Sequence, residues 1–141
     1  MDNGRKTILL VDDNKISLTA GKNILKDRYK TYPLLSAEIM FDLLEKVIPD
    51  MILLNIEMPE MDGYEAIKIL KENPRWNGIP VIFLTAMTGD GSDFEGLNLG
   101  AIDYMFKPFS APLLLKRIEN YFLLESLKKQ LIEIKELYGQ K

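Results

Sequence analysis

The sequence predicts a doubly wound α/β domain with a five-stranded parallel sheet, followed by an extended C-terminal helix. Short apolar runs alternate along the chain with amphipathic stretches of helical period. Fully apolar runs suit strands that helices cover on both faces, as in a parallel sheet. Polar and charged residues follow these runs directly, which is where such sheets place their functional groups.

The predicted strands are short, and each begins after a loop or a helix. They span residues 8–11, 31–36, 51–54, 81–84 and 101–106. The second strand contains Pro33, which has no backbone N–H to donate, so we expect this strand to lie at an edge of the sheet.

The predicted helices alternate with these strands. They span residues 15–28, 37–47, 63–72, 93–99 and a long stretch from 111 onward, and Gly100 ends the fourth. Strict alternation implies a parallel sheet with helices on both faces, and right-handed crossovers leave few topologies. We expect the flavodoxin-like strand order 2-1-3-4-5, with the functional crevice beyond the carboxyl ends of strands one and three.

Length and composition limit the classes of protein that fit. The chain has 141 residues, a net charge of −3, no cysteine and no histidine. It therefore has no disulfide, no thiolate zinc site and no imidazole base or ligand. Mild acidity argues against direct nucleic-acid binding. No apolar run is long enough to span a membrane. We expect a cytoplasmic protein with one domain over 1–122 and a helical extension over 123–141.

Four polar side chains at strand ends form a candidate site. Asp12 and Asp13 follow the first strand, Thr85 the fourth and Lys107 the fifth. Paired carboxylates suit a hard cation such as Mg²⁺, while a hydroxyl and a lysine suit phosphoryl oxygens. Together they predict a site for metal-assisted phosphoryl chemistry. Structural alternatives remain open: Asp13 or Asn14 would cap a helix, Thr85 would be structural, and Lys107 a solvated loop residue.

Several motifs in order along the chain resemble the receiver domains of two-component response regulators. The matching segments are Leu9 to Asn14, Pro49 to Leu54, Met58 to Glu65, Ile82 to Ala86, Gly100 to Tyr104 and Lys107 to Phe109. The resemblance covers about residues 6–122. It implies a phosphorelay signalling domain that is not itself an enzyme, with a sensor histidine kinase as its partner.

The resemblance also implies roles for individual residues. Asp12, Asp13 and the backbone carbonyl of Glu57 match the protein ligands of Mg²⁺. Thr85 matches the switch hydroxyl, and Lys107 matches the phosphate-binding lysine. Ala86 matches the small residue beside the site, Tyr104 the aromatic switch, and Lys107-Pro108 a cis peptide bond. For Tyr104, an ordinary half-buried strand aromatic is the structural alternative.

Asn55 departs from the family pattern, which has the phosphate-accepting aspartate at this position. An amide is a very poor nucleophile compared with a carboxylate. We therefore expect no phosphorylation in this form, and weakened Mg²⁺ binding because one negative charge is lost at the metal site. Two origins remain open. One is a substitution made to hold the unphosphorylated state, and the other is a natural pseudo-receiver that acts as an interaction or dimerisation module.

The apolar pattern near the end of the chain predicts a helix that pairs with another helix. Apolar residues alternate spacings of three and four, as in a heptad seam: Leu124, Leu127, Leu131, Ile134 and Tyr138. We expect this helix to pair in a homodimer and to lead to an output domain absent from this chain. The alternative is an amphipathic tail that packs on its own domain or frays.

Other phosphate-handling classes fit poorly. The sequence after the first strand, Val11 to Asn14, lacks the Asp-x-Asp spacing of haloacid-dehalogenase-like phosphatases. There is no P-loop, and the first strand–helix turn lacks the glycines of a dinucleotide site. A Mg²⁺-dependent phosphatase or nuclease is thus the less favoured interpretation.

Overall fold

The computed structural model describes residues 4–86 and 95–139. The chain divides into two compact units, residues 1–109 and 110–141. The first unit contains the sheet with four of the helices, and the second contains one long helix.

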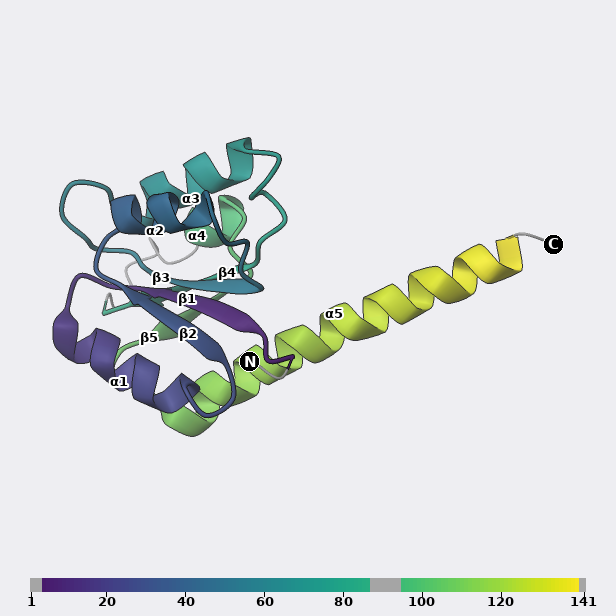
Figure 1. Cartoon of the computed structure of the whole chain (residues 1–141), viewed down its shortest axis with the longest axis horizontal. Helices are drawn as coiled ribbons and strands as arrows, with labels where there is room; N and C mark the ends of the chain where they lie inside the picture. The colour runs from purple at the N-terminus through teal and green to yellow at the C-terminus, as the bar shows by residue number, and fades with distance from the viewer. Residues whose placement is uncertain (1–3, 87–94, 140–141) are drawn as a thin grey trace. The chain divides into compact units, whose positions relative to one another are not determined.

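The sheet has five parallel strands in the order β2-β1-β3-β4-β5, so the predicted topology is confirmed (Figure 1). Their bounds are β1 (Thr7–Val11), β2 (Lys30–Leu34), β3 (Met51–Asn55), β4 (Val81–Thr85) and β5 (Asp103–Phe106). Each strand therefore ends within two residues of the position predicted from its apolar run. Because all strands run in one direction, their carboxyl ends meet at one edge of the sheet.

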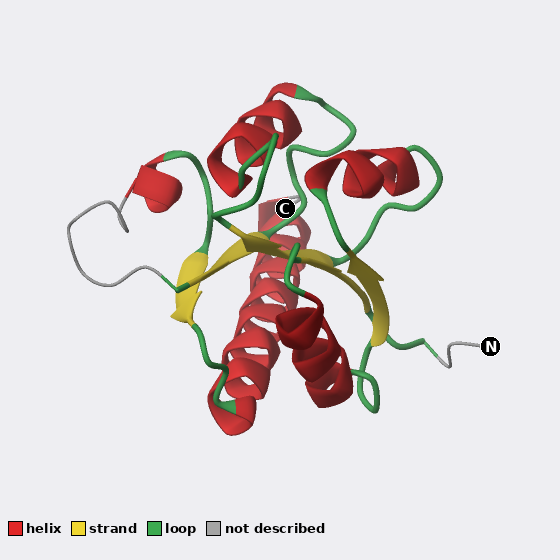
Figure 2. Cartoon of the chain, turned by 90° about the vertical axis from the view of Figure 1, so that its left-hand side faces the viewer, coloured by secondary structure: helices red, strands yellow, loops and turns green. Residues whose placement is uncertain are grey.

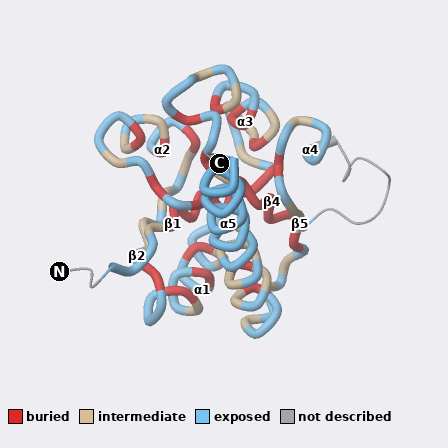
Figure 3. Tube along the Cα trace, turned by 90° about the vertical axis from the view of Figure 1, so that its right-hand side faces the viewer, coloured by how far each residue is buried: buried red, intermediate tan, exposed pale blue. Residues whose placement is uncertain are grey.

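The burial of each strand follows its place in the sheet. Every residue of β3 and β4 is buried, as is β1 apart from its first residue. The edge strands β2 and β5 are partly exposed (Figure 3). Pro33 lies in β2 at the edge, as predicted, where its missing N–H costs no ladder hydrogen bond.

Helices cover both faces of the sheet in the first unit. Helix α1 (Lys15–Leu25) lies on one face, and α2 (Ala37–Leu44), α3 (Gly63–Glu72) and α4 (Glu95–Asn98) lie on the other (Figure 2). Helices α1 and α2 end earlier than predicted. After each helix, two backbone N–H groups donate to one carbonyl, that of Leu25 or Leu43, and form a final turn. The apolar pattern therefore continues beyond the last helical residue. Residues 93 and 94 of the fourth predicted helix lie outside the described residues.

The second unit is α5 (Ala111–Gly139), a continuous helix of 29 residues (Figure 1). Leu114 and Ile118 in its first half are buried. From Leu123 to Gly139, every residue except Glu125 is exposed. The second half of α5 therefore presents its apolar residues without cover within its own unit. None of the helices in the described part of the chain combines the length and apolarity needed to cross a membrane.

Candidate functional site

Among the residues whose burial the structure describes, the buried polar side chains gather at the carboxyl edge of the sheet. Asp12 follows β1, Asn55 is the last residue of β3, and Thr85 is the last residue of β4. Their exposed fractions are 0%, 5% and 1%. Burying polar groups is unfavourable unless they are paired, so their partners decide what this edge can do.

Asp12 has a partner for each carboxylate oxygen. Its Oδ1 accepts a hydrogen bond from the backbone N–H of Asn14 at 2.9 Å. Its Oδ2 lies 2.6 Å from Nζ of Lys107, and the two side chains are 0% and 15% exposed. Oδ2 accepts no hydrogen bond of acceptable geometry, so the ammonium compensates its charge without satisfying it fully. This ion pair connects the end of β1 to the residue after β5.

The start of α1 settles which residue caps that helix. The side chain of Asn14 accepts hydrogen bonds from the backbone N–H groups of Ile16 and Ser17, at 2.9 and 3.1 Å. This is an ordinary N-cap, which satisfies amides that have no partner within the helix. Of the two predicted candidates, Asn14 is thus the cap. The carboxylate of Asp13 is left for a different partner.

That partner is Asn55. Its Nδ2 donates to the backbone carbonyl of Glu57 at 2.8 Å and to Oδ1 of Asp13 at 3.3 Å. A carbonyl and an ionised carboxylate only accept hydrogen bonds. They therefore determine the orientation of the amide, with its nitrogen toward them. The predicted residues Asp13, Asn55 and Glu57 thus lie together.

Thr85 and Lys107 are joined through the backbone. The N–H of Lys107 donates to the carbonyl of Thr85 at 2.9 Å. The Lys107-Pro108 peptide bond is cis, as the resemblance implied. Thr85 is buried at the end of β4, beside the segment that carries Lys107. Its role as a switch hydroxyl stays a prediction.

Tyr104 is the second residue of β5, and it is half-buried. Its ring centroid is 5.8 Å from that of Phe83, and Phe83 also meets Tyr64 edge-on at 5.4 Å. Such aromatic contacts fix the position of a ring beyond simple burial. This packing suits the structural interpretation of Tyr104, and its role as a switch stays a prediction.

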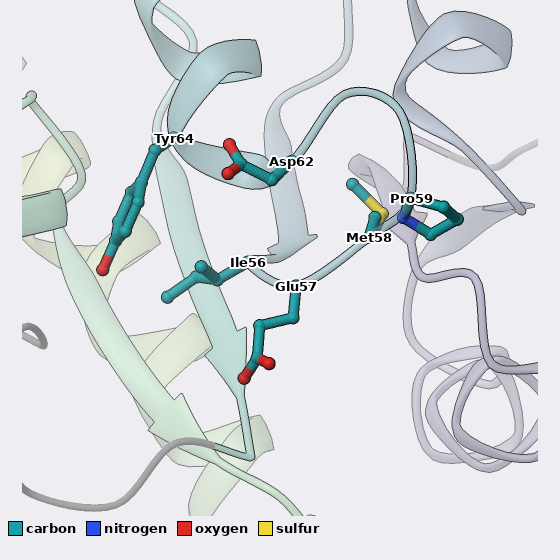
Figure 4. Close-up of a pocket in the computed structure, with 6 residues that line it drawn as sticks. All are labelled: Ile56, Glu57, Met58, Pro59, Asp62 and Tyr64. Carbon is teal, nitrogen blue, oxygen red and sulfur yellow. The ribbon is translucent and has the colours of Figure 1, made fainter.

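A surface pocket of about 530 Å³ adjoins the site along the loop after β3. Figure 4 shows the six residues that line it: Ile56, Glu57, Met58, Pro59, Asp62 and Tyr64. The loop contains Glu60, whose φ of 68° lies in the left-handed region. It ends where the Asp62 side chain and Glu65 form a reciprocal capping box at the start of α3. The pocket is therefore bounded on one side by a well-capped helix.

The oxygen atoms at this edge have the right chemistry for a hard cation. They come from Asp12, Asp13 and the carbonyl of Glu57, and Mg²⁺ prefers such ligands. In this structure, however, each ligand already faces a nitrogen donor: Lys107 for Asp12, and Asn55 for Asp13 and Glu57. Among the described residues, no three acidic side chains converge in a cluster that would hold a metal. The observed arrangement therefore does not fit a bound Mg²⁺.

Comparison with known proteins identifies the family. The model of the response regulator receiver domain matches residues 8–119, most of the chain. This chain belongs to the response regulator receiver family. The receiver fold and the strand order predicted from the sequence agree with that membership.

Relatives of this receiver domain occur alone and within longer proteins. A probable cyclic di-GMP phosphodiesterase of Vibrio cholerae is 40% identical over 115 residues, which are 82% of this chain but 26% of that protein. The polar-differentiation response regulator DivK of Brucella ovis is 31% identical over 82% of this chain and 95% of its own length. The chain thus spans about a quarter of the first relative and nearly all of the second.

Solved structures give the same fold. The receiver domain of a sensor histidine kinase from Pseudomonas aeruginosa, with a magnesium ion in its active-site cleft, has a TM-score of 0.76 and 27% identity. The alignment covers 83% of this chain and 97% of that one.

Sequence reasoning placed the site residues at one edge but missed how they pair. The contact between Lys107 and Asp12, and the two hydrogen bonds from the amide of Asn55, were not predicted. No sequence signal reports the pairs Asn55–Asp13 and Lys107–Asp12, because their members are 42 and 95 positions apart and meet only when the strands align. The aromatic stack around Phe83 was missed for the same reason. The bond from Asn55 to Glu57 is local, but it depends on the direction in which the amide turns.

Proposed function

We propose that this chain is a receiver domain of a phosphorelay whose phosphoacceptor position is Asn55, and that it accepts no phosphoryl group there. The observation that carries the proposal is the place of Asn55: a buried amide at the end of β3, hydrogen-bonded to Asp13 and Glu57. A receiver needs a nucleophilic carboxylate at its acceptor position, and an amide supplies none.

The surrounding residues support the assignment of this position. Asp12, Asp13 and Lys107 lie at the same edge and contact one another or Asn55. In a receiver, the acidic pair would hold Mg²⁺ and Lys107 would bind a phosphoryl oxygen. With Asn55 in place of an aspartate, Mg²⁺ binding is expected to be weaker, because one ligand charge is missing.

The proposed signalling partner is a sensor histidine kinase. Family membership supports this, as do the receiver domains of sensor kinases among the structural relatives. The receiver would cover residues 1–122, and residues 123–141 would lead toward an output domain. The longer relatives, in which the matched part is about a quarter of the protein, support this arrangement.

The test is incubation with acetyl phosphate and Mg²⁺, followed by intact-protein mass spectrometry. The unchanged chain is expected to gain no phosphoryl group, and Asn55→Asp is expected to gain one. Gain of a phosphoryl group by the unchanged chain would overturn the proposal. Failure of Asn55→Asp to react, while it remains folded, would show that position 55 is not the acceptor.

A second function, as a dimerisation module, rests on the exposed second half of α5. Its seam residues are each at least half exposed: Leu124, Leu127, Leu131, Ile134 and Tyr138. Leu127 follows the buried Ile118 by about two and a half turns, at about 3.6 residues per turn. It therefore lies on the face of the helix opposite the buried Ile118. A second copy of the same helix would cover such a seam.

The charges beside this seam favour a parallel pair. With Leu124 and Leu131 at position a, Lys128 and Lys135 occupy position e. In an antiparallel pair these lysines would face their counterparts and repel each other, whereas a parallel pair separates them.

Sedimentation tests the dimer directly. We expect Leu131→Lys to give a monomer and the exposed Ser126→Lys, off the seam, to leave a dimer. A monomeric unchanged chain contradicts the proposal.

A further inference from the structure

The acidic pocket, by which we mean the site formed by Asp12, Asp13, Asn55 and Lys107 and not the surface pocket of Figure 4, contains its own positive charge. The carboxylate of Asp12 is fully buried, and Nζ of Lys107 lies 2.6 Å from its Oδ2. A buried carboxylate is strongly unfavourable without a compensating charge. In this structure Lys107 supplies the charge that a divalent cation would otherwise bring to Asp12.

The remaining oxygens of the pocket face the amide of Asn55. This NH₂ group has two hydrogens, and the structure gives it two acceptors, the carbonyl of Glu57 and the carboxylate of Asp13. A Mg²⁺ ion would lie about 2.0–2.1 Å from both oxygens. The hydrogens of Asn55 point at the same oxygens, so the ion and the amide in this orientation exclude each other.

We propose that Lys107 and Asn55 together replace the divalent cation of the receiver site, so that the pocket is closed in a metal-independent state. The two carboxylates and one ammonium carry a net charge of about −1, where an aspartate at position 55 would make it about −2. The pocket thus attracts a cation less strongly, and it already contains the ammonium group of Lys107. The inference deepens the proposed function, on which it rests for the identity of the pocket.

The experiment is calorimetric titration of Mg²⁺ into the metal-free full chain, with thermal unfolding measured in chelator and in millimolar Mg²⁺ at matched ionic strength. We expect the unchanged chain to bind Mg²⁺ at least about tenfold more weakly than Asn55→Asp. Its unfolding midpoint should not move with Mg²⁺, whereas that of Asn55→Asp should rise.

The variant that isolates Lys107 is Lys107→Met. Without Mg²⁺ it is expected to unfold at a lower temperature, because Asp12 loses its countercharge. Mg²⁺ should then bind at least about fivefold more tightly than to the unchanged chain and should raise the midpoint. Lys107→Arg keeps the positive charge and should still exclude the ion. The exposed Lys129→Met is the matched control, and it should behave as the unchanged chain does.

Asn55→Ala tests the amide by itself, and it keeps the inference testable where Lys107→Met does not fold. It removes both N–H donors without adding charge, and it should bind Mg²⁺ more tightly than the unchanged chain. Equal Mg²⁺ affinity in the unchanged chain and in Asn55→Asp would overturn the inference. So would variants at Lys107 and Asn55 that gain no affinity. Because no phosphodonor is present, these outcomes are distinct from failure of the phosphorylation test.

Discussion

The backbone of Gly63 packs directly against the backbone of Asn55. A Cβ atom added to Gly63 would lie 2.7 Å from the carbonyl oxygen of Asn55, closer than such atoms approach in proteins. The N–H of Gly63 also donates to the carbonyl of Ile56 at 2.8 Å. Helix α3 therefore begins in contact with the residue that ends β3. A glycine at this position is what allows α3 to begin this close to the end of β3.

Gly63→Ala is therefore expected to destabilise the domain by about 2 kcal/mol, because a buried methyl group must displace backbone rather than a flexible side chain. Urea denaturation measures this loss. Gly78→Ala is the matched control, since an added Cβ there meets no atom within 4 Å. Equal stability of the two variants would contradict the close packing at Gly63.

Asp62→Ala is expected to lower the free energy of unfolding by about 1 kcal/mol. The Asp62 side chain accepts the N–H of Glu65 at 2.8 Å, and the Glu65 side chain accepts the N–H of Asp62 at 3.3 Å. The substitution removes the acceptor for the N–H of Glu65, while the backbone N–H of residue 62 can still donate to the Glu65 side chain. Asp62→Asn keeps an acceptor oxygen and should lose much less. The prediction is wrong if the two variants denature at the same urea concentration.

Asn55→Asp is expected to lose about 1–3 kcal/mol of stability when no divalent cation is present. The substitution exchanges two N–H donors for an acceptor that faces the carbonyl of Glu57 and the carboxylate of Asp13. Denaturation in chelator measures the loss. Asn23→Asp, at an exposed position of α1, is the control and should change little. A more stable Asn55→Asp protein in chelator would show that the two hydrogen bonds donated by the Asn55 amide do not stabilise the fold.

Tyr121 is expected to titrate later than an ordinary tyrosine. Burial, and then the negative charge and hydrogen bonding of Glu125, raise the pKa of Tyr121 to about 12. A raised pKa means that the fold favours the neutral phenol. The contribution of Tyr121 to stability is therefore complete below the ordinary pKa of about 10 and is lost as the pH rises toward 12.

Ultraviolet titration of tyrosinate, with Tyr121→Phe subtracted from the unchanged chain, isolates this group among the six tyrosines. Glu125→Gln should lower the pKa of Tyr121 but leave it above the ordinary value, because burial is the larger cause. A difference curve centred on the ordinary tyrosine pKa would contradict the prediction.

Much of the fold followed from local patterns. Fully apolar runs such as residues 51–54 and 81–84 have no polar face, so they require cover on both sides and predict central strands of a parallel sheet. Pro33 predicted an edge, and β2 lies there. Helix ends were less predictable, because apolar spacing continues into the turns after Leu25 and Leu43, where the hydrogen bonds close instead of propagating.

By itself, the sequence determined the sheet topology and the edge at which Asp12, Asp13, Asn55, Thr85 and Lys107 lie, because parallel strands bring their ends together whatever the loops do. Only the tertiary structure decided which of them touch. Lys107 pairs with Asp12, and Asn55 turns its nitrogen toward Asp13 and Glu57. Such choices depend on a few ångströms of separation and on which buried charge lacks a partner, and neither is encoded in local spacing.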